Sequence, residues 1–228
     1  MIRAVIFDLD GTLANTIPAI REGLNLTMKL YGYPEHTDAE VLTFINNGAR
    51  ELVRRAMPEE LRGDEETVSR VLADYDRLYA ETYYHTDRTY DGIPEVIAAL
   101  HARGLGIAVL SNKQDVFVKR LCEQLLPAGV CDVAQGVIAG KPTKPNRFLS
   151  DLVAEKLGVS PSECVMVGDS DVDVKTARAA GMAHVGVSWG FRDRKFLLEN
   201  GAEAIADTPA ELLDMIEKMI GMRGRRTC

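Results

Sequence analysis

The stretch Phe7-Asp8-Leu9-Asp10-Gly11-Thr12-Leu13 follows a short apolar run, Ala4-Val5-Ile6, close to the N-terminus. An apolar run that ends in a glycine-containing turn predicts a buried strand. Open parallel sheets bind their ligands beyond the carboxyl ends of the strands, which is where Asp8 and Asp10 lie. Side chains two residues apart on a strand point the same way, so both carboxylates face one site if the strand stays extended. Their repulsion needs compensation, and Mg²⁺ is the natural ion for hard oxygen ligands.

The composition is that of an ordinary globular protein: 228 residues, 46% hydrophobic and 27% charged, with a formal net charge of -7. A negative net charge argues against nucleic acid or an anionic membrane as a partner. No apolar run is long enough to span a bilayer, and a chain that enters a strand at once does not begin with a signal peptide. Cys122, Cys131, Cys164 and Cys228 have no CxxC spacing. We therefore expect reduced thiols and a cytoplasmic protein.

The order of apolar patterns predicts an α/β fold. Residues 15–88 carry helical spacing throughout, whereas the chain after Tyr90 alternates short apolar runs with helical segments. Such alternation is typical of βα units around a parallel sheet. We expect a Rossmann-like parallel core from residues 1–14 plus 89–228, flanked by helices, with residues 15–88 inserted as a helical domain of about four helices. The later strands are expected at residues 107–110, 133–138, 164–167, 185–187 and 204–206.

Polar side chains follow three of the predicted strands. Carboxylates, a hydroxyl and a lysine gathered at one sheet edge suit a phosphate held beside a metal, because the metal neutralises both kinds of oxygen. Lysine adds a point charge to a phosphate oxygen, and serine hydroxyls supply orienting hydrogen bonds. The residues concerned are Asp8 and Asp10 after the first strand, Ser111, Asn112 and Lys113 after the second, Asp169 and Asp173 after the fourth, and Lys141 and Lys144 between the last two groups.

These residues give the chain a clear resemblance to the haloacid dehalogenase superfamily of Asp-dependent phosphohydrolases. Phe7–Leu13 resembles its first motif, Ser111 its second, Lys144 its third, and Gly168-Asp169 with Asp173 its fourth. The four motifs stand in the family's order, and the similarity covers essentially the whole chain. The helical insertion is similar to the small cap that this family carries between its first two motifs.

The resemblance implies a role for each matching residue. Asp8 would be the nucleophile that becomes an aspartyl phosphate, and Asp10 the general acid and then base. Asp8, the backbone oxygen of Asp10 and Asp169 would hold Mg²⁺, with Asp173 supporting that shell through water or Lys144. Ser111, Asn112 and Lys144 would bind the phosphate, and Lys144 would also serve catalysis by screening its charge. Asn112, like its neighbour Lys113, is equally consistent with a solvated loop.

The third motif leaves a choice between two lysines, because neither Lys141 nor Lys144 fits the family's Lys-Pro-x-Pro pattern fully. Lys144 is preferred because it leads straight into the helix at Phe148 and lies at the family's usual distance from Gly158. Within the superfamily, Asn46–Val53 and Val187–Phe191 resemble the phosphoglycolate phosphatase branch.

The resemblance therefore implies a Mg²⁺-dependent phosphatase of a small phosphorylated metabolite, as a monomer or homodimer. Four alternatives stay open. The same fold could act on a sugar phosphate, a nucleotide or pyrophosphate. The chain could be a phosphomutase, or a dehalogenase, although Asp10 and Gly11-Thr12 follow the phosphatase pattern. It could also be a catalytically silent binding protein, against which the intact motif set argues.

Overall fold

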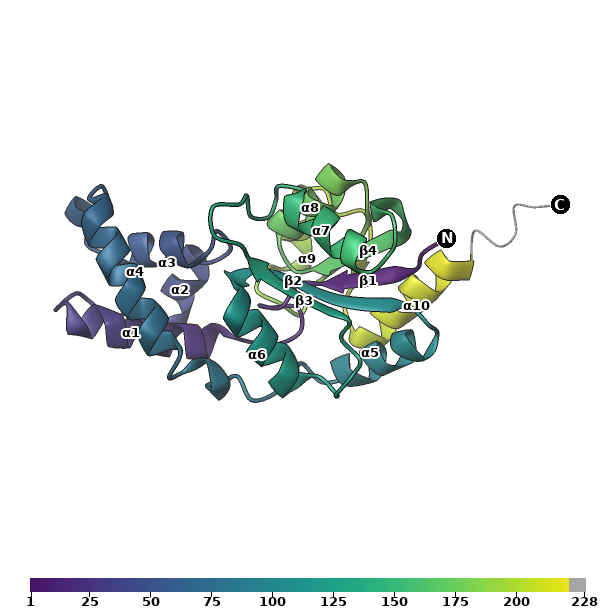
Figure 1. The fold of residues 1–228 in the computed structure, drawn as a ribbon, viewed down its shortest axis with the longest axis horizontal. Coiled ribbons are helices and arrows are strands. Elements are labelled where there is room, and N and C mark those ends of the chain that lie inside the picture. The colour runs from purple at the N-terminus through teal and green to yellow at the C-terminus, as the bar shows by residue number, and fades with distance from the viewer. Residues whose placement is uncertain (222–228) are drawn as a thin grey trace.

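The computed structural model of the protein describes residues 1–221, so Cys228 lies outside the described residues. Strands and helices alternate after the first hundred residues, as the pattern predicted (Figure 1). The strands are β1 (Ala4–Phe7), β2 (Gly106–Gln114), β3 (Val133–Val137), β4 (Cys164–Gly168), β5 (Ala183–Val187) and β6 (Ile205–Ala206). The helices are α1 (Ile17–Leu30), α2 (Asp38–Phe44), α3 (Ala49–Ala56), α4 (Glu65–Tyr79), α5 (Ile93–Ala102), α6 (Asp115–Leu125), α7 (Phe148–Lys156), α8 (Asp171–Ala180), α9 (Arg194–Glu199) and α10 (Pro209–Gly221).

The six strands form one parallel sheet in the order β3-β2-β1-β4-β5-β6. The predicted α/β fold with a parallel core is therefore confirmed. β1 lies in the interior of the sheet, where Phe7 is in register with Val109 of β2 and Val167 of β4. Because parallel strands share a direction, the segments that follow these three strands meet at one edge. The sheet order thus brings the predicted motifs together.

Both faces of the sheet are covered by helices, and β1 shows how the sequence achieves this. Val5 and Phe7 belong to a buried cluster with α5, α6 and α10, whereas Ala4 and Ile6 belong to another with α7 and α8. Alternate residues of a strand point to opposite faces, so a strand covered on both sides must be apolar at every position. The uninterrupted run Ala4–Phe7 meets that requirement, and each of its residues is buried.

Helices α1 to α4 pack on one another and extend to one side of the sheet (Figure 1). Their buried residues form a separate apolar cluster, to which the α/β part contributes Phe117 of α6. The chain enters and leaves this helical part at neighbouring points, since the Tyr90 amide donates to the Leu13 carbonyl at 2.9 Å. The boundaries at residues 15 and 88 fall in these connecting segments and stay a prediction.

The end of one strand differs from the sequence expectation. β2 continues to Gln114, with an irregular register between Leu110 and Gln114, instead of ending at Ser111. Beyond the irregular stretch, Gln114 is still paired with Val137 of β3. Among residues 1–221, no helix is both long and apolar enough to cross a membrane.

Candidate active site

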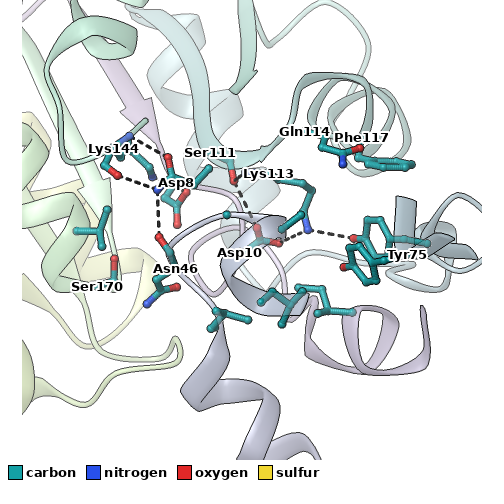
Figure 2. Close-up of a pocket in the computed structure, with 18 residues that line it drawn as sticks. Asp8, Asp10, Asn46, Tyr75, Ser111, Lys113, Gln114, Phe117, Lys144 and Ser170 are labelled. Atoms are coloured by element: carbon teal, nitrogen blue, oxygen red, sulfur yellow. Dashed lines mark hydrogen bonds and ion pairs between the residues drawn. The ribbon is translucent and has the colours of Figure 1, made fainter. Parts of the chain in front are cut away.

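The two carboxylates after β1 lie in the same pocket but have different partners (Figure 2). Asp8 is buried, and its backbone amide continues the sheet by donating to the Val167 carbonyl at 2.8 Å. Gly11 then turns the chain with a φ of +85°, a conformation that glycine adopts without strain. The turn leaves Asp10 half-buried, beside residues of β2 instead of beside the partners of Asp8.

Lys144 is the lysine that contacts Asp8. Its Nζ lies 2.7 Å from Asp8 Oδ1, 2.7 Å from Asp173 Oδ1 and 3.0 Å from the Leu110 carbonyl oxygen. Burial alone would lower the pKa of Lys144, but the Asp173 and Asp8 carboxylates raise it above its ordinary value, so the ammonium stays charged. Lys141, the alternative for the third motif, is exposed and lies over the Phe148 ring.

Asp8, Asp169 and Asp173 form a buried acidic cluster in which one carboxylate oxygen from each lies within 4.8 Å of the others. Burial raises the pKa of Asp169 to about 7, and Asp173 acts in the same direction. Burial also raises the pKa of Asp8 well above its ordinary value, while Lys144 opposes that shift. When all three carboxyl groups are ionised, they share the single ammonium of Lys144, which leaves an excess of negative charge in a buried place.

This donor set fits a divalent cation. Carboxylate oxygens at close range are the ligands of hard divalent ions, and a charge of +2 would balance the two carboxylates that Lys144 leaves uncompensated. The surroundings also hold the oxygens tightly. A Cβ on Gly168 would overlap the Asp173 carboxylate, and a Cβ on Gly11 would overlap that of Asp169. The glycines of the first and fourth motifs thus let the backbone approach the acidic side chains closely.

Asp169 is held by groups from two distant segments. The Thr12 hydroxyl donates to Asp169 Oδ1 at 3.1 Å, and the Phe191 amide donates to Asp169 Oδ2 at 2.7 Å. Sequence reasoning did not include Phe191 among the site residues. The sequence feature that could have indicated this contact is Gly190, because a Cβ on this residue would lie 2.6 Å from Asp169 Oδ2. A glycine after the apolar run of β5 marks such a close backbone approach.

Residues at the end of β2 contact Asp10. The Ser111 hydroxyl donates to Asp10 Oδ2 at 3.3 Å, and Lys113 Nζ lies 3.1 Å from Asp10 Oδ1. Asn112 is occupied by protein groups, since its amide nitrogen donates to the Asn46 and Lys144 carbonyls and its amide oxygen accepts from the Lys144 amide. Phosphate binding by Asn112 stays a prediction; in this structure the side chain ties the helical part to the Lys144 loop.

The pocket lies between the sheet edge and the helical part, so its two walls differ in character (Figure 2). The sheet edge supplies the charged and polar groups described above. The opposite wall comes from α1, α3, α4 and the segment between α2 and α3. It is mainly apolar and aromatic, with Ile20, Ile45, Ala49, Leu52, Tyr75 and Tyr79 among its residues and Phe117 of α6 beside them.

Comparison with known proteins agrees with this geometry. The family model described as haloacid dehalogenase-like hydrolase matches residues 2–181, which include all four motifs. The chain belongs to the haloacid dehalogenase-like hydrolases. The resemblance that the motifs indicated is therefore confirmed.

Relatives of this haloacid dehalogenase-like hydrolase include phosphoglycolate phosphatases from different bacteria. Phosphoglycolate phosphatase of Vibrio vulnificus is 30% identical over 222 residues, with 94% of this chain and 96% of the relative covered. Phosphoglycolate phosphatase of Thiobacillus denitrificans is 32% identical over 223 residues, with 95% and 96% covered. The similarity thus extends over the helical part as well as the sheet.

Solved structures show the same fold as this hydrolase. A protein from Lactobacillus delbrueckii subsp. bulgaricus with the provisional name phosphoglycolate phosphatase has a TM-score of 0.86 and 31% identity, with 94% of this chain and 98% of that chain covered. CbbY from Rhodobacter sphaeroides, solved as a mutant with xylulose-1,5-bisphosphate, has a TM-score of 0.75 and 26% identity, with 93% and 96% covered.

Proposed function

We propose that the protein is a Mg²⁺-dependent phosphatase that hydrolyses a small organic phosphate monoester through an aspartyl phosphate, and that it is most like phosphoglycolate phosphatase. The observation that carries the proposal is Asp8, a buried carboxylate at a strand end that touches Lys144, adjoins Asp169 and faces a partly enclosed pocket. A nucleophile, a cation and an acidic cluster are the parts that phosphoryl transfer needs. The names of the relatives agree with this chemistry.

Each residue has a distinct part in the proposed reaction. An Asp8 oxygen attacks phosphorus and forms an acyl phosphate while the bond to the leaving oxygen breaks. Asp10 donates a proton to that oxygen and later takes one from the water that hydrolyses the acyl phosphate. The Ser111 hydroxyl and the Lys144 ammonium bind phosphate oxygens, for which Lys144 redirects one of the three N–H groups that Asp8, Asp173 and the Leu110 carbonyl accept in this structure. The ammonium also screens the phosphate charge from the incoming carboxylate. Asp173 keeps Lys144 beside Asp8 through its 2.7 Å contact.

Mg²⁺ would be held by Asp8, the backbone oxygen of Asp10 and Asp169. When bound, it would supply positive charge to the phosphate oxygens and favour the ionised form of Asp8. Asp173 would support this arrangement through its contact with Lys144, without being a Mg²⁺ ligand itself. Thr12 and the Phe191 amide fix the orientation of Asp169 by their hydrogen bonds.

We further propose that residues 15–88 act as a cap domain over the core of residues 1–14 and 89–228. Its apolar wall faces the predicted phosphate site across the pocket, so it would limit the size of the leaving group and keep water from the phosphoenzyme. The substrate would be a small phosphorylated metabolite of the cytoplasm. A monomer or a homodimer would each contain complete sites, because the described residues of one chain supply every group named above.

One observation favours a second candidate. The CbbY neighbour is described as a complex with xylulose-1,5-bisphosphate, so a sugar phosphate is the alternative substrate, and a phosphomutase the alternative reaction. The two reactions differ in where the phosphoryl group goes. A phosphatase releases it to water as inorganic phosphate, whereas a mutase returns it to the carbon skeleton. Product analysis from labelled phosphoenzyme separates them.

The decisive experiment is Asp8→Asn in the full-length protein with Mg²⁺ and a panel of small phosphate esters. Because the amide cannot form the acyl phosphate, we expect phosphate release to fall at least about a thousandfold, as for loss of a nucleophile. Circular dichroism and thermal unfolding should show an intact fold. Asp151→Asn is the matched control, since Asp151 pairs with Arg147 on the surface. Near-native turnover by Asp8→Asn would exclude Asp8 as the nucleophile.

A further inference from the structure

The pocket holds two lysines whose hydrogen-bonding capacity is used differently. An ammonium has three N–H donors and no acceptor. Lys144 uses all three, on Asp8, Asp173 and the Leu110 carbonyl. Lys113 donates to the Tyr79 hydroxyl at 3.0 Å and forms an ion pair with Asp10. At least one N–H of Lys113 is therefore available to a ligand, although its side chain is only 8% exposed.

Tyr79 provides a second donor at the same place. Within residues 1–221 its hydroxyl acts as an acceptor, from Lys113, so its own O–H can still donate. The ring is fixed by stacking on Tyr75, with centroids 5.5 Å apart, and by an edge contact with Phe117 at 4.9 Å. The hydroxyl of a buried, packed tyrosine and the ammonium of a buried lysine thus stand together beside Asp10.

We propose that Lys113 and Tyr79 bind a carboxylate on the leaving group, next to the ester oxygen, and so select carboxylate-bearing phosphate esters. The inference rests on the proposed function, in which Asp10 protonates the ester oxygen. Lys113 Nζ lies 3.1 Å from Asp10 Oδ1. If Asp10 protonates the ester oxygen, the ammonium and the ester oxygen therefore lie on either side of the Asp10 carboxyl group. A carboxylate on the adjacent carbon reaches this place, and its two oxygens match two donors.

The rest of the pocket makes Lys113 the necessary partner for such an anion. An unpaired charge against an apolar wall is strongly unfavourable, and Leu52, Ile20 and Phe117 offer it no hydrogen bond. Arg50, a cation of α3, is exposed and engaged by Glu65 and the Ser69 hydroxyl outside the pocket lining. Lys144 already serves the phosphate end. The carboxylate therefore has one cationic partner on its own side of Asp10.

The test compares two substrates of equal shape, phosphoglycolate and its neutral carboxamide, by kcat/KM with Mg²⁺. The ratio between them is the readout, because Lys113 also contacts Asp10 and its loss would lower both rates. We expect Lys113→Met to reduce the preference for the carboxylate about tenfold to a hundredfold, the size of a charge-assisted hydrogen bond. Tyr79→Phe should reduce it about threefold to tenfold, and Lys113→Arg should retain part of it. Arg50→Met is the control and should leave the ratio unchanged.

The outcomes separate this inference from the proposed function. A wild-type preference for the carboxylate that both Lys113→Met and Tyr79→Phe diminish supports the assignment. Phosphate release with an unchanged ratio in these variants, or a wild-type preference for the carboxamide, overturns it and leaves the phosphatase standing. Should Lys113→Met fail to fold, Tyr79→Phe decides, since it removes one hydroxyl. If the wild type hydrolyses neither these esters nor any in the panel, the proposed function itself falls, and the inference with it.

Discussion

Asp169 has a carboxyl group whose proton would compete with a bound cation. Burial raises its pKa to about 7, so below that pH the folded, metal-free protein keeps this group protonated. A cation must displace that proton, and its affinity therefore falls as the pH falls through about 7. We expect the increase in Tm produced by Mg²⁺ to be larger at pH 8 than at pH 5.5. Thermal unfolding with and without Mg²⁺ at both pH values measures it.

Asp169→Asn provides the comparison for that measurement. The amide does not titrate, so the pH dependence contributed by Asp169 should disappear along with most of the Mg²⁺ effect. An increase in Tm that is the same at both pH values in the wild type would show that proton and cation do not compete at Asp169. The readout is binding instead of turnover, so it does not depend on knowing the substrate.

Individual contacts were predictable from the sequence to different degrees. Asp8, Asp169 and Asp173 come after strands that were expected in one parallel sheet, so their convergence at one sheet edge was foreseeable, and Lys144 was the preferred lysine. The ion pair of Lys113 with Asp10 was not foreseeable. Lys113 lies in the irregular end of β2, and an apolar run does not reveal where a strand's register shifts. Their roles in catalysis stay predictions.

At the scale of an element, α1 tests whether the helical part depends on its own apolar cluster. Leu24 is fully buried in that cluster, whereas Leu30 on the same helix is 57% exposed. We expect Leu24→Ala to lower the free energy of unfolding by about 2–5 kcal/mol, from lost burial and the cavity that remains. Leu30→Ala, the matched control, should change it by no more than about 0.5 kcal/mol. Urea denaturation followed by circular dichroism measures both, and equal effects would contradict the described packing.

The sequence predicted the elements themselves better than their ends. β1 and β4 are short apolar runs with glycine close behind, so their type and position were clear. The start of α1 was less clear. Thr16 is a favourable N-cap residue by type, yet it has helical backbone angles and makes no capping hydrogen bond; the Asn15 side chain accepts from the Ile17 amide instead. Which of two neighbouring polar residues caps a helix depends on backbone angles that residue type alone does not determine.

For the whole molecule, the separate apolar clusters predict that the helical part and the α/β part unfold locally and independently of each other. Local opening follows the packing of each cooperative unit. In Leu24→Ala, we expect amide hydrogen exchange to accelerate in α1 to α4 while β1 and β4 keep nearly wild-type protection. Ile97→Ala in α5 is the converse control, because Ile97 is fully buried in the cluster beneath the sheet. Equal acceleration in both parts would mean a single cooperative unit, against the proposed domain division.

The hydrogen bond between the Tyr90 amide and the Leu13 carbonyl also bears on how such a protein can diversify. The segment between Leu13 and Tyr90 is therefore a loop whose two ends meet at the sheet. Doubling the length of a flexible loop raises its closure free energy by only about 0.6 kcal/mol. Segments of very different length could therefore be accommodated between the same two attachment points. The carboxylates at the sheet edge would keep their reaction while the segment opposite them changed, so new substrates could be acquired without rebuilding the chemistry.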